Sequence, residues 1–297
     1  MGEITLLDGG MGQELLKRSA QPPHPMWSAK VLLDEPEIVA AVHRDYIAAG
    51  ARRITLNTYA ASPERLAQGG RSDLFRPLQT RAIELAKSAV AASGQDVRIA
   101  GCLPPLFASY RPELAPDFQA NLVLYRQIVA LEKDHVDLFQ CETLGSIAEA
   151  TAACTAAVES GLPVWVSLSI RDDDSKTLRS GEPLLDALAA LEGLGAEALL
   201  LNCSTPEAIS HALPDLVATG SPVGAYANGF AGVTALEPGG TVDVLQARHD
   251  LDPATYADFA MGWIEAGVTI IGGCCETTPA HIAEIARRLK AAGYDII

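Results

Sequence analysis

The chain has 297 residues, of which 48% are hydrophobic and 20% are charged. These proportions are typical of a globular chain that buries a sizeable core, and no low-complexity block interrupts them. With 37 acidic and 22 basic side chains the formal net charge is −15, which repels phosphate backbones and anionic membrane surfaces. We therefore expect neither nucleic acid nor a membrane as a partner.

Eight short apolar runs rich in β-branched residues are predicted to be strands. Their residues are apolar on both faces, as in a parallel sheet that is covered on both sides. In chain order they are ITLLDGG near residue 4, RRITLNTY near 53, VRIAGC near 97, VDLFQCET near 136, PVWVSLS near 163, AEALLLNCS near 197, PVGAYANG near 222 and VTIIGGCC near 268.

Segments with apolar residues three and four positions apart lie between these runs and are predicted to be helices. PEIVAAVHRDYIAAG, SIAEATAACTAAVESG and TYADFAMGWIEAG each close on a glycine, which helix ends favour. Strand and helix thus alternate without a break in composition, which predicts a single domain over residues 1–297. An α/β fold, a single (β/α)8 TIM barrel, is the economical interpretation, and a doubly wound open sheet is the alternative.

Polar residues and cysteines gather at the carboxyl ends of the predicted strands. In a barrel these ends meet at one rim, where barrel enzymes build their active sites. The sequence therefore predicts that these residues lie together although they are far apart along the chain. They are Asp8, Asn57, Thr58, Glu142, Cys203, Asn228, Cys274 and Cys275.

Three of the six cysteines are predicted to be metal ligands. The start of the chain, MGEITLLDGG, has neither a basic segment nor a long apolar one, so we expect a cytoplasmic protein whose thiols stay reduced. Three thiolates are available from Cys203 and from Cys274 and Cys275, which are neighbours in the sequence. A catalytic zinc site with three cysteine ligands keeps its fourth position open. A vicinal disulfide is the structural alternative for the pair.

The other three cysteines are expected to be small core residues, since cysteine is among the most frequently buried side chains. Cys102 and Cys141 fall near the predicted rim and could also support the site from behind, whereas Cys154 lies inside a predicted helix.

Several segments together resemble the homocysteine S-methyltransferase family over nearly the whole chain: LLDGGMGQELLKR, NTYAAS, VDLFQCETLGSIAEA, LLLNCS and IIGGCCETTPAHI. The pairing of NC at 202–203 with GGCC at 272–275 is the most specific. Family members are zinc-dependent barrels that transfer a methyl group to homocysteine and form methionine. The resemblance implies that Cys203, Cys274 and Cys275 bind Zn²⁺ and that the homocysteine sulfur takes the fourth position, so no side chain is expected to act as a general base.

By the same resemblance, Asp8 and Glu142 bind the ammonium group of homocysteine, and backbone N–H groups near Gly9, Gly10 and Met11 take its carboxylate. The physical chemistry agrees, because carboxylates attract an ammonium and a glycine-rich turn before a helix presents N–H groups to an anion. The candidate substrate-binding set is completed by three residues for which a role as turn formers is the alternative: Asn57, Thr58 and Asn228.

The donor pocket is predicted to include Trp27, Tyr59 and Thr143. Betaine-using relatives surround the quaternary ammonium with aromatic side chains, as cation–π attraction favours, but Thr143 stands where those enzymes carry a tyrosine. The chain also shares WSAKVLL with the branch that uses sulfonium donors. S-methylmethionine or S-adenosylmethionine is therefore expected, with betaine or dimethylsulfoniopropionate as alternatives.

Two other functions stay open from the sequence. The chain could be a homocysteine-binding module that works with a separate cobalamin protein, or a zinc-free barrel whose thiols are structural. The chain ends at RRLKAAGYDII, after the last predicted helix, and lacks the extension by which some relatives build tetramers. A monomer or homodimer is therefore expected.

Overall fold

The computed structural model describes residues 2–237 and 240–297, and each of the eight predicted runs overlaps a strand. A short ninth strand near the end of the chain was not predicted. The strands are β1 (Glu3–Leu6), β2 (Arg53–Thr55), β3 (Arg98–Leu103), β4 (Leu138–Leu144), β5 (Val164–Leu168), β6 (Ala198–Asn202), β7 (Val223–Tyr226), β8 (Ile270–Ile271) and β9 (Asp295–Ile296).

Helices separate the strands, and the helix starts follow ordinary capping chemistry. The side chains of Ser62, Asp117, Ser146, Thr205 and Asp252 each accept a hydrogen bond from the backbone three residues later. The helices are α1 (Met11–Arg18), α2 (Ser28–Asp34), α3 (Pro36–Ala49), α4 (Pro63–Gln68), α5 (Phe75–Ser93), α6 (Phe118–Glu132), α7 (Ile147–Val158), α8 (Leu184–Leu191), α9 (Pro206–Val217), α10 (Pro253–Glu265) and α11 (Pro279–Ala291).

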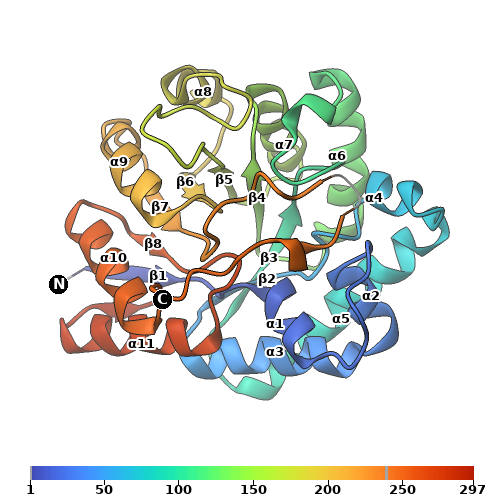
Figure 1. The fold of residues 1–297 in the computed structure, drawn as a ribbon, viewed down its shortest axis with the longest axis horizontal. Helices are drawn as coiled ribbons and strands as arrows, with labels where there is room; N and C mark the ends of the chain where they lie inside the picture. The colour runs from blue at the N-terminus through green and yellow to red at the C-terminus, as the bar shows by residue number, and fades with distance from the viewer. Residues whose placement is uncertain (1, 238–239) are drawn as a thin grey trace.

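All paired strands run parallel in one sheet of order β2-β3-β4-β5-β6-β7-β8-β1-β9. The sheet is curled, with the strands at the centre and the helices around them (Figure 1). Beyond the end of β1, Leu7 forms a parallel bridge with Arg53, the first residue of β2, and the Arg52 N–H donates to the Leu6 carbonyl at 2.8 Å. The fold is therefore α/β with a curled parallel sheet, as the strand and helix alternation predicted.

The inner face of the sheet carries a small apolar cluster with a polar network above it. This cluster includes Leu7, Leu200 and Ile270. Along each strand, such inward-facing side chains alternate with side chains that face the helices. Above them, the Gln140 amide and the Tyr226 hydroxyl are 3.0 Å apart, and the Tyr226 hydroxyl donates to Ser167 at 2.8 Å. Because such a network is satisfied internally, it gives the floor of the site a fixed shape.

Within the described part of the chain, no helix is long and apolar enough to cross a membrane.

His43, on α3, lies in the core, and neither of its ring nitrogens has a hydrogen-bond partner among the described residues. Burial lowers the pKa of His43 from 6.5 to about 4. Between pH 6.5 and 4 the imidazole of His43 therefore binds a proton in the unfolded chain but stays neutral in the folded chain. The contribution of His43 to stability is full above pH 6.5 and is lost as the pH falls toward 4.

We expect His43→Leu to reduce the fall in unfolding free energy between pH 6.5 and 4 by about 3 kcal/mol, at about 1.4 kcal/mol per pKa unit. Urea denaturation at four pH values measures this slope, with a chelator present so that metal release does not contribute. His211→Leu, at an exposed position on α9, is the matched control and should keep the slope. An unchanged slope in His43→Leu would contradict the buried, neutral state of His43.

Candidate metal centre and pocket

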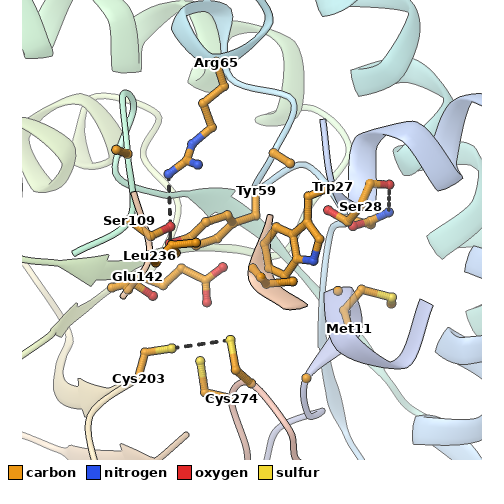
Figure 2. A pocket seen from close by; sticks show the side chains of 18 of the residues that line it. Met11, Trp27, Ser28, Tyr59, Arg65, Ser109, Glu142, Cys203, Leu236 and Cys274 are labelled. Carbon is orange, nitrogen blue, oxygen red and sulfur yellow. Dashed lines mark hydrogen bonds between the residues drawn. The ribbon is translucent and has the colours of Figure 1, made fainter. Parts of the chain in front are cut away.

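A cavity of about 670 Å³ opens at the carboxyl ends of the strands. Asp8 follows β1, Asn57 follows β2, Glu142 belongs to β4, Cys203 follows β6 and Cys274 follows β8, and all five line it. Figure 2 shows Glu142, Cys203 and Cys274 on one side of this cavity. The strand ends therefore bring together residues that are up to 266 positions apart, as the sequence predicted.

Cys203, Cys274 and Cys275 form a thiol cluster whose sulfur atoms all lie within 4.8 Å of one another. The sulfur atoms of Cys203 and Cys275 are 3.8 Å apart. A tetrahedral zinc ion with Zn–S bonds of about 2.3 Å places two sulfur ligands about 3.8 Å apart. The thiols of this cluster therefore fit a tetrahedral metal ion in both chemistry and spacing.

All six cysteines are free thiols, so the adjacent pair does not form a vicinal disulfide here. The Cys203 backbone has a φ of 49°, in the left-handed region that a side chain rarely adopts. Its N–H donates to the Tyr226 carbonyl at 3.2 Å. Strained backbone of this kind is common at functional sites, where the surrounding structure holds it in place.

Two further residues, Tyr110 and Arg179, support Cys203 and were missed in the sequence. The Tyr110 hydroxyl lies 3.0 Å from the Cys203 sulfur. Arg179 donates to the Cys203 carbonyl at 3.2 Å, lies over the Tyr110 ring at 5.3 Å and pairs with Asp172 at 2.8 Å. Tyr110 lies seven positions beyond β3, where inspection of the strand ends does not reach.

Asp8 and Glu142 line the cavity as two carboxyl groups with no cationic partner among the described residues. Burial raises the pKa of Asp8 to about 8, against a hydrogen bond from the Thr55 N–H at 2.9 Å. Burial likewise raises the pKa of Glu142 to about 7, while the Cys102 thiol donates to its Oε1 at 3.0 Å. Two enclosed carboxyls without a cation are suited to receive a cationic ligand group.

The glycine turn before α1 lies against the cysteine loop. A side chain at Gly10 would place its Cβ 2.6 Å from the Cys274 carbonyl oxygen, so only glycine fits there. The Gly10 N–H already donates to the Thr277 carbonyl at 2.9 Å, and the Met11 N–H donates to the Gly9 carbonyl at 2.8 Å. These two N–H groups, which were predicted to hold a carboxylate, are therefore engaged within the protein in this structure.

The aromatic side chains of Trp27 and Tyr59 also line the cavity, edge to face with ring centroids 5.8 Å apart (Figure 2). The Tyr59 hydroxyl is 2.9 Å from the Ser109 hydroxyl. Thr143 touches the cavity but turns its hydroxyl toward Asn202, whose amide donates to it at 2.9 Å. The three residues predicted for the donor pocket thus lie at one cavity with the thiol cluster.

Two of the predicted substrate residues do not line the cavity. The Thr58 hydroxyl donates to Glu132 on α6 at 2.9 Å, away from the site. Asn228 is fully buried and accepts a hydrogen bond from the Phe230 N–H at 3.1 Å within its own turn. Asn57 does line the cavity, next to Thr58.

The remaining cysteines are buried, as expected. Cys141 and Cys154 belong to the main hydrophobic core. Cys102 is 1% exposed and contacts the site through its hydrogen bond to Glu142, so it supports the site from behind.

A curled parallel α/β sheet whose strand ends carry a three-thiol metal centre, two carboxyls and an aromatic pair defines a candidate metalloenzyme. A family model, Homocysteine S-methyltransferase, matches residues 5–289. The chain therefore belongs to the homocysteine S-methyltransferase family, which confirms the resemblance and the prediction that it is a methyltransferase.

Relatives and solved structures agree with this membership. A homocysteine S-methyltransferase of Escherichia coli is 33% identical over 96% of this chain and 95% of its own length. Homocysteine S-methyltransferase 4 of Zea mays is 29% identical over 100% of this chain and 92% of its own. The metallated form of the homocysteine methyltransferase MmuM from Escherichia coli superposes with a TM-score of 0.80 at 32% identity, covering 96% of both chains.

The position of Trp27 depends on Gly12, in α1. A Cβ at Gly12 would lie 2.1 Å from Cζ2 of the rigid Trp27 ring. We expect Gly12→Ala to displace this ring, to cost about 1–3 kcal/mol of unfolding free energy and to change the tryptophan fluorescence. Urea denaturation and emission spectra measure both effects.

Gly262, inside α10, provides the matched control because nothing lies within 4 Å of a Cβ built there. Gly262→Ala should stabilise the protein by about 0.5–1 kcal/mol, the ordinary gain of alanine over glycine in a helix. Equal effects of the two substitutions would show that Trp27 does not pack on Gly12.

Proposed function

We propose that the chain is a zinc-dependent enzyme that transfers a methyl group from a sulfonium donor, S-methylmethionine or S-adenosylmethionine, to the thiolate of homocysteine and forms methionine. One observation carries the proposal: three thiols whose sulfur atoms lie within 4.8 Å of one another share a cavity with two unpaired carboxyls and an aromatic pair. Betaine, dimethylsulfoniopropionate and a separate cobalamin protein are the other sources of the methyl group to be tested.

The proposal includes a complete (β/α)8 barrel that forms a single domain over residues 1–297. The Leu7 to Arg53 bridge and the hydrogen bond from the Arg52 N–H to the Leu6 carbonyl support closure between β1 and β2. One main hydrophobic cluster with members from all along the described chain supports the single domain. The wall of the cavity is then continuous around the rim.

Cys203, Cys274 and Cys275 would hold Zn²⁺ through their thiolates. When bound, zinc keeps a coordinated substrate sulfur deprotonated near neutral pH, where a free thiol with a pKa of about 8.5 is mostly protonated. The chain's own part is to fix the three sulfurs, through the Tyr110 contact to Cys203 and the close-packed turn that carries the other two cysteines.

Homocysteine is proposed to bind by its amino acid end next to this cluster. Asp8 and Glu142 attract the ammonium group, and the cost of burying two carboxylates is offset once a cation lies between them. The carboxylate is proposed to lie at the turn of Gly9, Gly10 and Met11, where the dipole of α1 favours an anion although the Gly10 and Met11 N–H groups are bonded within the protein. Asn57 faces the same cavity. Thr58 and Asn228 are proposed to act indirectly, by shaping the turns beside it.

In the proposed reaction the homocysteine sulfur, having lost its proton, donates an electron pair to the methyl carbon. The bond between that carbon and the donor sulfur breaks, and its electrons remain on the donor sulfur, which becomes a neutral thioether. Trp27 and Tyr59 form an aromatic wall suited to a sulfonium. Holding the two sulfurs and the carbon in line supplies most of the remaining rate enhancement.

A sulfonium is favoured over betaine because Thr143 presents no aromatic face to the cavity. Its hydroxyl and backbone N–H are both bonded to Asn202 at 2.9 Å, which fixes this side chain in the wall. We propose a cytoplasmic monomer or homodimer, a setting in which the free thiols of the cluster stay reduced.

Removal of one ligand provides the first test. We expect freshly purified protein to contain one zinc ion per chain, and Cys274→Ala to lose the ion and at least about 1,000-fold of its activity together. Elemental analysis measures the metal, and methionine formation from homocysteine measures the activity with each candidate donor.

Cys154→Ala is the matched control because Cys154 is a buried cysteine in α7 outside the cluster. It should keep both zinc and activity despite some loss of stability. A wild-type protein that takes up no zinc under reducing conditions would make the thiols structural and overturn the proposal.

The ammonium site provides a second test. We expect Glu142→Gln to raise the KM for homocysteine about 10- to 100-fold, the usual worth of a charge-assisted hydrogen bond. Methyl transfer to 4-mercaptobutyrate, which lacks the amino group, should change far less. If both acceptors lose activity equally, Glu142 does not act on the ammonium.

A further inference from the structure

Arg65, on α4, is a half-buried cation that lines the same cavity as the thiol cluster. It has no carboxylate partner among the described residues, and the remaining positions 1, 238 and 239 are Met, Pro and Gly. The other two basic side chains with permanent charge on this cavity are paired: Lys30 with Asp34 at 2.5 Å and Arg71 with Asp73 at 3.2 Å.

The hydrogen bonds of Arg65 fix the guanidinium but leave part of it free. Nε and Nη2 donate to the Pro105 carbonyl at 3.2 and 3.0 Å, and Nη2 also donates to the Ser109 hydroxyl at 3.2 Å. For Nη1 no acceptor is found in the described part of the chain. Neutral oxygens hold the orientation of the group without compensating its charge, and enclosed charges in proteins are ordinarily paired.

Glu149, whose carboxyl acts on Arg65 through its charge, does not fill this role. Its Oε2 accepts a hydrogen bond from the Ser146 hydroxyl at 3.0 Å at the start of α7. Glu149 forms no ion pair with Arg65 in the described part of the chain. Arg65 therefore presents a positive charge, which guanidinium groups keep at all ordinary pH values, on a cavity whose other end is acidic.

The aromatic pair lies between the two ends of this cavity. The Arg65 guanidinium covers one face of the Tyr59 ring at 5.2 Å, and Tyr59 meets Trp27 on another side. In Figure 2 Tyr59 lies between Arg65 and the sulfur atoms of Cys203 and Cys274. A bare sulfonium at this aromatic wall would be repelled by the guanidinium, whereas a donor that also carries a carboxylate would neutralise it.

We propose that Arg65 binds the carboxylate of the methyl donor and thereby selects donors that carry one. This inference rests on the proposed methyl transfer. The donor lies along the cavity with its carboxylate on the free edge of the guanidinium and its sulfonium toward Glu142 and the thiol cluster. The carboxylate and the sulfonium of the donor then each lie near opposite charge, which fixes the direction of the donor in the site and points the reacting methyl group at the acceptor sulfur.

The test compares S-methylmethionine with dimethylpropylsulfonium, which has the reacting centre but no carboxylate. In Arg65→Met we expect the KM for S-methylmethionine to rise about 10- to 100-fold. The KM for homocysteine should stay within about twofold, and the rate with dimethylpropylsulfonium should stay the same or rise, since neither compound uses the guanidinium and its repulsion of a bare sulfonium is lost. Arg65→Lys keeps the positive charge but lacks the paired N–H donors of the guanidinium. Its KM for S-methylmethionine should fall between those of the wild type and Arg65→Met. Arg126, an exposed residue of α6, pairs with Glu159, and Arg126→Met should behave as wild type.

Binding is measured separately from catalysis, so that a failure of the proposed methyl transfer can be distinguished from a failure of the role assigned to Arg65. Calorimetry follows S-methylmethionine binding to wild type and Arg65→Met in the presence of homoserine, which has no reacting thiol. Circular dichroism verifies that the variants are folded. Weaker binding of S-methylmethionine only in Arg65→Met supports the assignment even if no methyl transfer occurs. Unchanged binding, or an equal loss with both sulfonium compounds in a folded Arg65→Lys protein, overturns it.

Discussion

The close approach of two backbone segments, the turn after β1 and the loop after β8, underlies the whole site. The Gly273 N–H donates to the Asp8 carbonyl at 3.0 Å, and the Gly10 N–H donates to the Thr277 carbonyl at 2.9 Å. A Cβ at Gly10 would lie 2.6 Å from the Cys274 carbonyl oxygen. The two segments pack backbone against backbone, and this contact places Asp8 beside the adjacent cysteines. Substitution of Gly10 would push the two segments apart and so separate the carboxyl from the thiols without changing any ligand.

The cavity that results is electrostatically uneven. Its inner end carries the thiol cluster with Asp8 and Glu142, and its wall carries the unpaired Arg65. Separating opposite charges in an enclosed space costs free energy in the empty protein, and part of that cost is visible in the raised pKa values of the two carboxyls. A zwitterionic amino acid is the kind of ligand that recovers this cost, which links the charge distribution to the proposed substrates.

The sequence contained enough to predict the strands, the thiol cluster and the two carboxyls, because these residues directly follow apolar runs. It did not contain enough for Tyr110 and Arg65. Both lie in segments beyond the strand ends, and their approach to the cavity depends on how the loops fold over the rim. β9 has only two residues and no apolar run to mark it. Asn57 and Thr58 show the limit most clearly, since neighbouring positions in one turn face opposite sides and residue type does not tell which faces the site.

The direction of Thr58 has a physical cause that reaches the site from outside the sheet. Gly101 leaves space for the Glu132 carboxyl, since a Cβ there would lie 2.6 Å from Oε2. Glu132 accepts hydrogen bonds from the Thr58 hydroxyl and from the Cys102 N–H, both at 2.9 Å. Cys102 in turn donates its thiol to Glu142. A helix residue thus fixes the backbone of β3, and that strand orients the carboxyl proposed to bind the substrate ammonium. Cys102 is therefore a buried cysteine whose hydrogen bond to the site, and not its volume alone, explains why a thiol stands at that position.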